Sequence, residues 1–355
     1  MDGGGGVSGR RPPTIEEVAA RAGVSRGTVS RVINGEPGVS IRRAELVRQA
    51  IAELGYVPNR VARALVTNRT NSVALVFVGT SDGMLGHEYF ARVVRGVHST
   101  LQPADLQLVL LIWETDADRD KVERFLLSGH VDGAVLLSLA EGDPLPSRLA
   151  RAGMAVAVGG RVRASSPLVL QIDVDNVGGA RQAVEHLAAG GRRVIGTVAG
   201  LTDRAVGADR LRGWRDALIA RGLECGDDLV VTGDFTRAAG DRGVRELLAR
   251  RPDLDAVFAA GDDMALGVLD ALAVLGRRVP DELAVVGFDG SDAAGRSEPP
   301  LTTVAQPLER FGAELAGLLV ARLRGEQPAV AALPTELVVR ASSGPLSAPG
   351  PAGRR

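Results

Sequence analysis

The sequence has little with which to build covalent or metal-based chemistry. Its 355 residues include one cysteine, Cys225, which excludes an intrachain disulfide framework and most thiolate metal sites. The four histidines are scattered, and none pairs with another at the i, i+4 spacing of a metal-binding helix. We therefore expect neither a metal nor a cofactor.

Long apolar runs are also lacking. No stretch approaches the roughly 20 apolar residues that a membrane-spanning helix needs. The glycine-rich N-terminus, residues 1–13, has no apolar segment of the kind found in secretory signals and is expected to be a disordered arm. The composition, 45% hydrophobic and 24% charged, is typical of a globular protein with a sizeable core. These features predict a cytoplasmic protein with no membrane partner.

Lysine is almost absent, and the arginines are unevenly spread. Of the 42 basic residues only Lys121 is a lysine. Residues 1–70 contain eleven arginines and six acidic residues, a net charge of +5 in a chain whose formal charge is −1. A basic head on an acidic body indicates that only the head meets a polyanion. On charge alone, solvated arginine-rich faces remain an alternative.

Short helices with clear boundaries are predicted for residues 14–58. Thr14 and Glu17 form a T-x-x-E capping box ahead of apolar residues at helical spacing. Gly23 breaks this run, Ser25 can cap a second helix, and Ser40 can cap a third. This is the helix-turn-helix pattern, in which the second helix enters the major groove with its N-terminal side chains on base edges. Many three-helix bundles do not bind DNA, but the basic charge favours DNA here. The candidate DNA contacts are Ser25, Arg26, Thr28, Ser30 and Arg31.

From Ser72 onward, apolar runs alternate with amphipathic helical stretches. This alternation predicts a parallel α/β architecture, and the number of runs favours two sheets with a ligand cleft between two lobes. The tail from Ser342 is rich in Gly, Pro and Ala and is expected to be disordered to residue 355. The predicted strands are residues 73–78, 106–112, 131–137, 155–158, 168–172, 193–198, 229–231, 256–259 and 283–287.

The residues of the head closely resemble the DNA-binding head of the lactose-repressor (LacI/GalR) family. The resemblance rests on AGVS at 22–25, TVSRVING at 28–35 and LGYVPN at 54–59. It continues through RVARAL at 60–65, which is similar to the family's hinge helix, and through VVGFD at 285–289. It covers nearly the whole chain, roughly Thr14 to Ser342.

The resemblance implies a small all-α helix-turn-helix head, a hinge helix and a two-lobed α/β core with parallel sheets, similar to periplasmic sugar-binding proteins. The head would span residues 14–58 and the hinge helix and linker 59–71, followed by an effector-binding and dimerisation core at 72–341. Lobe one would take about 72–171 plus 305–328, and lobe two about 172–304 plus 329–341. Three crossings between the lobes are implied, near Ile172, Val304 and Ala329.

For function, the resemblance implies a repressor that binds a pseudo-palindromic double-stranded operator as a homodimer or a higher oligomer. A small effector, a sugar or sugar derivative, would control it. Thr14, Asn34, Asn59 and Ala62 join the implied DNA contacts. Leu65 becomes the apolar side chain that inserts into the central minor groove and bends the duplex. The alternative for Leu65 is an ordinary core leucine on a short helix.

The resemblance also implies an effector site in the cleft. Arg210, ahead of Gly213, matches an arginine that clamps ligand hydroxyls, Asp289 matches a ligand-binding acid at a strand end, and Phe235 matches a stacking aromatic. The alternatives are a surface arginine and a core phenylalanine. Departures from the family pattern at residues 86–90, 160–161 and 261 leave the effector's identity open. They add Glu88, Tyr89 and Arg161 as candidates. The adjacent acids Asp262 and Asp263 would suit acid/base chemistry, but the favoured interpretation is that Asp262 is either structural or in contact with the ligand.

Two other functions have some support in the sequence. Residues 79–83 fit G-x-S-x-G, which would make Ser81 a hydrolase nucleophile, but residues 84–86 intervene where a nucleophile elbow needs a helix. A sugar-binding protein without DNA function would share the body but would need export. Residues 173–178 begin like a calcium loop and then fail its ligand pattern at Val177. We expect a protein that is not an enzyme.

Overall fold

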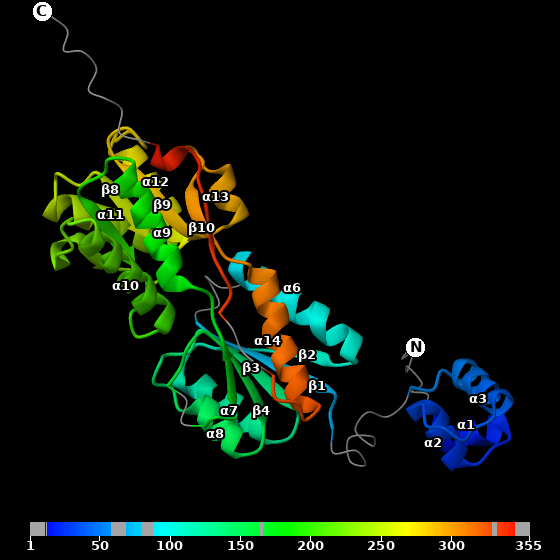
Figure 1. The fold of residues 1–355 in the computed structure, drawn as a ribbon. Coiled ribbons are helices and arrows are strands. Elements are labelled where there is room, and N and C mark those ends of the chain that lie inside the picture. Colours follow the sequence, from blue (N-terminus) through cyan, green and yellow to red (C-terminus); the bar gives the residue numbers. More distant parts are fainter. Residues whose placement is uncertain are drawn as a thin grey trace, which may run out of the picture. The chain divides into compact units, whose positions relative to one another are not determined.

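The computed structural model of the chain describes residues 11, 13–57, 69–79, 88–163, 166–328 and 332–344 (Figure 1). It divides into two units, Met1–Thr70 and Asn71–Arg355. Most of the expected N-terminal arm and the residues from 345 on lie outside the described part. So do the hinge candidates Asn59, Ala62 and Leu65, together with Ser81, and what was expected of them stays a prediction.

The first unit contains three helices, α1 (Ile15–Ala22), α2 (Arg26–Asn34) and α3 (Ile41–Leu54). The capping box of α1 is present, because the Thr14 hydroxyl accepts from the Glu17 amide while the Glu17 carboxylate accepts from the Thr14 amide. Ser25 caps α2 through the Thr28 amide. The helices pack around fully buried valines, Val18, Val29 and Val47.

The third expected cap differs from the prediction. Ser40 occupies the N-cap position of α3, but its hydroxyl makes no capping hydrogen bond. The residue is exposed, so water can satisfy the free amides at this helix start.

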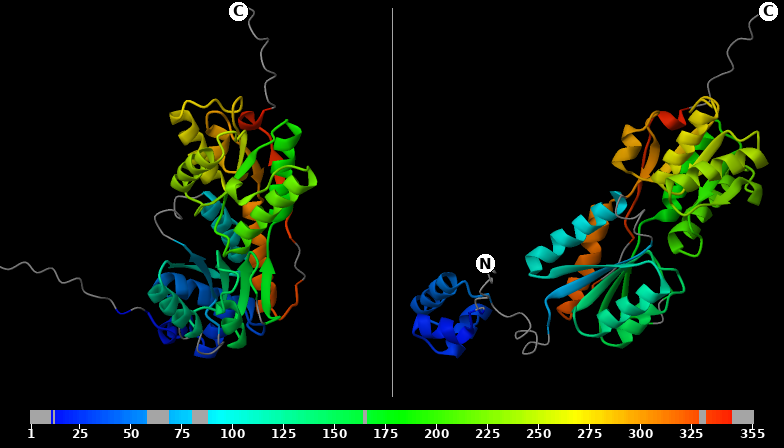
Figure 2. Two further views of the ribbon diagram at one scale, coloured as in Figure 1. Left: turned by 90° about the vertical axis from the view of Figure 1, so that its left-hand side faces the viewer. Right: turned by 180° about the vertical axis from the view of Figure 1, so that it is seen from behind.

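The second unit begins with a five-stranded parallel sheet, in the order β2-β1-β3-β4-β5, which we call lobe one. Helices α6 and α14 pack on one face of it, and α7 and α8 on the other (Figures 1 and 2). The strands are β1 (Ser72–Val78), β2 (Gln107–Trp113), β3 (Gly133–Leu137), β4 (Ala155–Gly159) and β5 (Val169–Ile172). The helices are α6 (Glu88–Leu101), η1 (Gln102–Ala104), α7 (Asp116–Leu127), α8 (Leu145–Arg151) and α14 (Leu308–Leu323).

Lobe two contains a six-stranded sheet in the order β11-β10-β9-β8-β6-β7. All of its neighbours are parallel except β10 and β11. The strands are β6 (Ile195–Ala199), β7 (Val230–Thr232), β8 (Ala256–Ala259), β9 (Ala284–Asp289), β10 (Thr302–Ala305) and β11 (Glu336–Val338). The helices are α9 (Asn176–Ala189), α10 (Ala205–Ala220), η2 (Asp227–Leu229), α11 (Arg237–Arg250), α12 (Asp262–Val274), α13 (Asp292–Arg296) and η3 (Ala341–Ser343). The predicted class, two parallel α/β sheets in a two-lobed core, is confirmed, although β10 and β11 were not among the expected strands.

The chain passes between the lobes after β5, after β10 and after α14. The first and third passages are tied together, because Asp175 donates its amide to the Leu333 carbonyl at 2.8 Å and Leu333 donates to the Asp173 carbonyl at 2.9 Å. Val174 and Leu333 form a parallel bridge at the same point. Ala329 lies outside the described residues. These paired segments form one wall between the lobes, which we call the hinge strands.

The core extends beyond the expected boundary at residue 341. Ser342 and Ser343 are buried, and the Ser342 hydroxyl accepts from the Thr302 amide at 2.8 Å and donates to the Val285 carbonyl at 2.6 Å. The expectation of disorder from Ser342 is therefore wrong for these residues, because small hydroxyl side chains satisfy buried backbone groups of the sheet. No helix in the described part of the chain is long and apolar enough to cross a bilayer.

Candidate functional site

A cavity of ≈ 460 Å³ lies between the two lobes, and we call it the effector cavity. Its lining includes Gly79 after β1, Ser138 after β3, Gly160 after β4 and Asp289 at the end of β9. These are the carboxyl ends of parallel strands, where ligands bind in open α/β sheets. The volume suits a small organic molecule, since such sites usually measure about 300–1,000 Å³.

Arg210 of α10 reaches into the effector cavity from a buried position, with 3% of its side chain exposed. Its Nε donates to Asn176 Oδ1 at 2.9 Å, and its Nη1 donates to the Ala260 carbonyl at 2.5 Å and to Asp289 Oδ1 at 3.2 Å. The guanidinium also lies 3.6 Å from the centre of the Phe288 ring, a cation–π contact. Arg210 is therefore not a surface arginine.

The packing of α10 explains why Arg210 is held so deeply. A Cβ on Gly213 would lie 2.3 Å from the Val177 carbonyl oxygen, so only glycine lets α10 approach α9 this closely. Trp214, the next residue, is fully buried and donates its indole N–H to the Ile195 carbonyl. The Gly-Trp pair thus fixes the helix that carries the arginine.

Asp289 is the acidic partner of Arg210. Its Oδ1 accepts from Arg210 and, at 2.6 Å, from Gln306 Nε2. Its backbone has a φ of 122°, which is unusual for a residue other than glycine and is a form of strain found at functional sites. Burial raises the pKa of Asp289, while Arg210 and the Gln306 hydrogen bond act in the opposite direction. Burial lowers the pKa of Arg210, and Asp289 opposes that change.

Five aromatic side chains of the described residues line the cavity, and two of them, Phe235 and Tyr89, were expected from the sequence. Phe235 adopts a left-handed φ of 67°, and a Cβ on Gly200 would lie 2.1 Å from its ring, so Gly200 makes room for it. Tyr89 of α6 packs edge-on against Phe77. Burial, followed by the charge of Asp289, raises the pKa of Tyr89, so its hydroxyl stays a donor at neutral pH.

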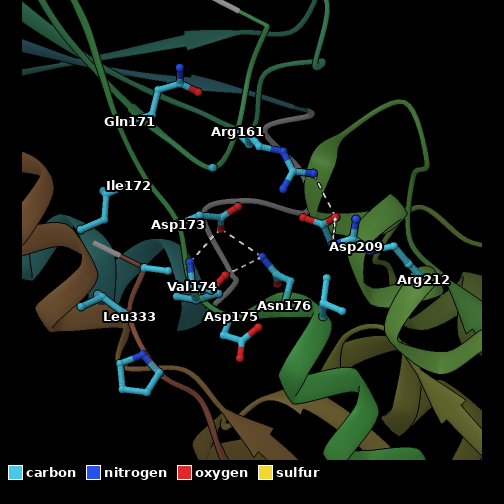
Figure 3. Close-up of a pocket in the computed structure, with 14 residues that line it drawn as sticks. Arg161, Gln171, Ile172, Asp173, Val174, Asp175, Asn176, Asp209, Arg212 and Leu333 are labelled. Atoms are coloured by element: carbon cyan, nitrogen blue, oxygen red, sulfur yellow. Dashed lines mark hydrogen bonds and ion pairs between the residues drawn. The ribbon is translucent and has the colours of Figure 1, made fainter. Parts of the chain in front are cut away.

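Arg161 also lines the effector cavity, but its charge is already paired. Its Nη2 donates to Asp209 Oδ1 of α10 at 2.9 Å, as Figure 3 shows. The ion pair links the loop after β4 in lobe one to lobe two. Asp209 is buried, whereas half of the Arg161 side chain is exposed.

Two of the expected contacts do not line the effector cavity. Asp262 lies behind Asp289, where its carboxylate accepts from the Thr303 hydroxyl at 2.5 Å and the Ser291 amide at 2.7 Å. Burial, and then the charge of Asp289, raise the pKa of Asp262 to about 7. Glu88 accepts from the Asp292 amide at 2.6 Å, so it ties α6 to lobe two. Both carboxylates therefore accept hydrogen bonds from other groups of the protein.

The structure adds cavity residues that the sequence did not indicate, Asp173, Asn176, Arg204 and Gln306. Asp173 and Asn176 follow a predicted strand, which was a usable signal, but neither was predicted to contact an effector. Gln306 follows β10, which was not predicted. No sequence signal marks Arg204. Within the described ranges, no group of three or more His, Cys, Asp or Glu side chains could hold a metal ion.

In the head, α2 presents its polar face to solvent. Arg26 and Arg31 are exposed, and Arg26 lies 3.3 Å from Glu16 Oε1. A Cβ on Gly27 would meet only the Ser25 hydroxyl, so the space beside Arg26 is open. The other candidates bond locally: Ser25 with Thr28, Ser30 with Asn34, and Thr14 with Glu17. Exposed arginines beside open space suit bidentate contact with guanine in a major groove.

A helix-turn-helix head followed in the same chain by a two-lobed core with a polar cavity defines a DNA-binding regulator that responds to a small ligand. Residues 14–59 match the bacterial regulatory proteins of the lacI family, and residues 184–343 match the periplasmic binding protein-like domain. The HTH-type transcriptional regulator CelR of Thermobifida fusca is 48% identical over 336 residues, which cover 94% of this chain and 99% of that protein. Catabolite control protein A of Priestia megaterium is 30% identical over 336 residues, which cover 93% and 99%. The chain belongs to the lacI family of bacterial regulatory proteins.

Solved structures agree. A complex of the transcriptional regulator CelR with cellobiose is 46% identical, covers 93% of this chain and 99% of that one, and has a TM-score of 0.74. The lac repressor bound to ONPG in the repressed state is 27% identical, covers 94% and 100%, and has a TM-score of 0.82. These relatives are regulators rather than enzymes, so the family excludes both the hydrolase and a sugar-binding protein without DNA function.

Proposed function

We propose that this protein is a cytoplasmic transcriptional repressor whose effector is a neutral β-linked disaccharide of the cellobiose type. It would bind a pseudo-palindromic operator as a dimer. The observation that carries the proposal is the buried Arg210, held by Asn176 and Asp289 in a cavity lined by aromatic rings. The similarity to CelR, which has been solved with cellobiose, supports the same ligand class.

The chemistry of the effector cavity favours a sugar. A pyranose carries hydroxyl groups around its rim, each of which both donates and accepts, and apolar C–H faces above and below. Arg210 supplies a fixed donor fork, Asp289 supplies acceptors, and Gln306 and Asn176 bring amide groups to the same cavity. Phe235 and Tyr89 offer apolar surfaces for a ring face.

The charge of the cavity favours a neutral ligand. Three arginines and five acidic residues line it, and one of those arginines, Arg161, is already paired with Asp209. A phosphorylated sugar or a uronic acid would add a negative charge to a site with an acidic excess, which like-charge repulsion disfavours. The arginines are Arg161, Arg204 and Arg210, and the acids are Glu114, Asp173, Asp234, Asp263 and Asp289.

Isothermal titration calorimetry on the full chain tests the proposal. Cellobiose is expected to bind, maltose to bind more weakly because its α-linkage turns the second ring, and glucose 6-phosphate not to bind. Failure to bind cellobiose, or tighter binding of the phosphosugar, would overturn the proposal. The same titration in the presence of operator DNA gives the sign of the effect.

A further inference from the structure

A second cavity of ≈ 610 Å³ lies beside the effector cavity, against the hinge strands (Figure 3). We call it the hinge cavity. Residues 172–175 of the first passage and 332–334 of the third form much of its wall. The two cavities have five lining residues in common, Gly160, Arg161, Asp173, Val174 and Asn176. They are therefore neighbours that meet along a shared boundary.

Helix α10 stands at this boundary. Asp209 lines the hinge cavity, and Arg210, the next residue, lines the effector cavity. Arg161 lines both and reaches across from lobe one to bind Asp209 at 2.9 Å. The Arg161–Asp209 ion pair therefore lies where one cavity gives way to the other.

The ion pair is well supported on its acidic side. Only 7% of the Asp209 side chain is exposed, and Arg212 Nη2 lies 3.6 Å from the same carboxylate oxygen. On the other side, Gly160 has a left-handed φ of 91°, a conformation that glycine adopts without strain, and it turns the chain immediately before Arg161. A partly buried pair with a fixed approach is better defined than a surface pair.

We propose that Arg161 sets the length of the effector, because its ion pair with Asp209 walls off the hinge cavity and confines the ligand to two sugar rings. The inference rests on the proposed function. The hinge cavity has the chemistry to accept a third ring, with the Gln171 amide and the Asp175 carboxylate beside apolar Leu333 and Pro334. Removing the guanidinium would join the two cavities.

The alternative role for Arg161 is direct contact with the effector. The two roles differ in one ratio, the affinity for cellobiose divided by the affinity for cellotriose. Loss of a direct contact weakens both ligands together and leaves the ratio unchanged. Loss of a wall improves cellotriose relative to cellobiose, because steric exclusion acts only on the longer ligand.

The test is calorimetry of both sugars on the full-length parent, on Arg161→Ala and on an Arg161→Ala, Asp209→Ala double variant. The double variant removes both charges, so no buried carboxylate is left unpaired. The matched control is Arg163→Ala, in the same loop. Arg163 is 82% exposed, lies 3.6 Å from Glu141 and lines neither cavity.

The parent is expected to prefer cellobiose over cellotriose by about tenfold or more, and both wall variants to lose most of that preference. The Arg163→Ala control should keep it. An unchanged ratio in the wall variants, or no preference in the parent, overturns the inference while cellobiose binding itself stands. If the parent binds neither sugar, the proposed function fails as well.

Discussion

The guanidinium of Arg210 both forms hydrogen bonds with the protein and is available to a ligand. Its Nε and Nη1 are used by the protein, on Asn176, Ala260 and Asp289. Among the described residues nothing accepts from its Nη2, which leaves one end of the fork for a ligand hydroxyl. The hydrogen bonds to the protein hold the guanidinium in place before a ligand arrives. This preorganisation lowers the entropic cost of binding.

Replacing Arg210 by lysine separates these two roles. The ammonium keeps a positive charge near Asp289, which avoids the roughly 3–5 kcal/mol cost of leaving a buried charge unpaired. It cannot reproduce the planar fork. We expect Arg210→Lys to weaken cellobiose binding at least about tenfold, or about 1.4 kcal/mol, in calorimetry. Arg215→Lys, on the exposed side of the same helix, is the control, and equal losses in both variants would contradict the assignment.

The raised pKa of Asp262 predicts how the stability of the protein depends on pH. Its pKa is raised from 3.8 to about 7 in the folded protein, so the folded state binds a proton that the unfolded state has released between these values. Stability from this group is therefore present at low pH and is lost as pH rises towards 7, by up to about 1.4 kcal/mol per pH unit.

The matched variant for that prediction is Asp262→Asn, which does not titrate. Urea unfolding at pH 5, 6, 7 and 8 should show the parent losing stability relative to the variant up to pH 7 and changing little beyond it. Parallel stability curves for the two proteins would show that Asp262 is ionised throughout this range.

Among the helices and strands, α2 is the element expected to contact the bases of the operator. Arg26 stands in its first turn, exposed and beside the open position of Gly27. Arg26→Ala is expected to relax preference at one base pair per half-site, at a cost of about 1–3 kcal/mol against the correct base. The measurement is binding to an operator panel at fixed salt. Arg21→Ala, an exposed arginine at the end of α1, removes the same charge and is the control.

The same panel can also show that Arg26 does not read bases. A uniform loss of affinity over the whole panel, equal to that of Arg21→Ala, would show that Arg26 contacts only phosphate.

Helices α6 and α14 of lobe one lie side by side and touch through glycines (Figures 1 and 2). A Cβ on Gly312 would lie 2.2 Å from the Val93 carbonyl oxygen, whereas a Cβ on Gly317 of the same helix would meet nothing within 4 Å. Gly312→Ala should therefore destabilise the core by about 1–3 kcal/mol through overpacking. Gly317→Ala should stabilise it by about 0.5–1 kcal/mol, since alanine favours helix. Denaturant unfolding is expected to give changes in the free energy of unfolding of opposite sign for the two variants. If Gly312→Ala stabilised the protein as Gly317→Ala does, the helices would be able to move apart.

Over the whole molecule, local patterns predicted much of the fold and less of the site. Runs such as residues 73–78 are apolar because both faces of a parallel sheet are covered, and periodicity detects them. Strand β10 was not predicted because Thr302 and Thr303 are polar and interrupt the apolar pattern. Their hydroxyls form hydrogen bonds within the core rather than facing solvent. Strand β11 begins with the exposed, charged Glu336 and has only two apolar residues after it, so no apolar run marks it.

The site divides in the same way. Arg210 and Asp289 were predicted by resemblance because each lies in or beside a recognisable motif, and Phe235 because it occupies the position of the family's stacking aromatic. Gln306 and Asn176 required the fold, since one follows β10 and the other follows the first hinge strand, and only the fold brings both to the same cavity. The Arg161–Asp209 pair joins residues 48 positions apart on different lobes, and nothing local in either sequence indicates the partner.

Sugar bound in the effector cavity is expected to change the affinity of the head for its operator. Coupling between two binding equilibria is reciprocal, so cellobiose must change operator affinity by the same factor by which operator changes cellobiose affinity. The measurement is fluorescence anisotropy of labelled operator across a cellobiose titration, for the parent and for Arg210→Lys. We predict that the parent shifts its operator affinity by about 5-fold or more, which is typical of allosteric proteins, and that the variant needs a higher sugar concentration for the same shift. Operator affinity that stays constant while the parent is saturated with cellobiose would contradict the account.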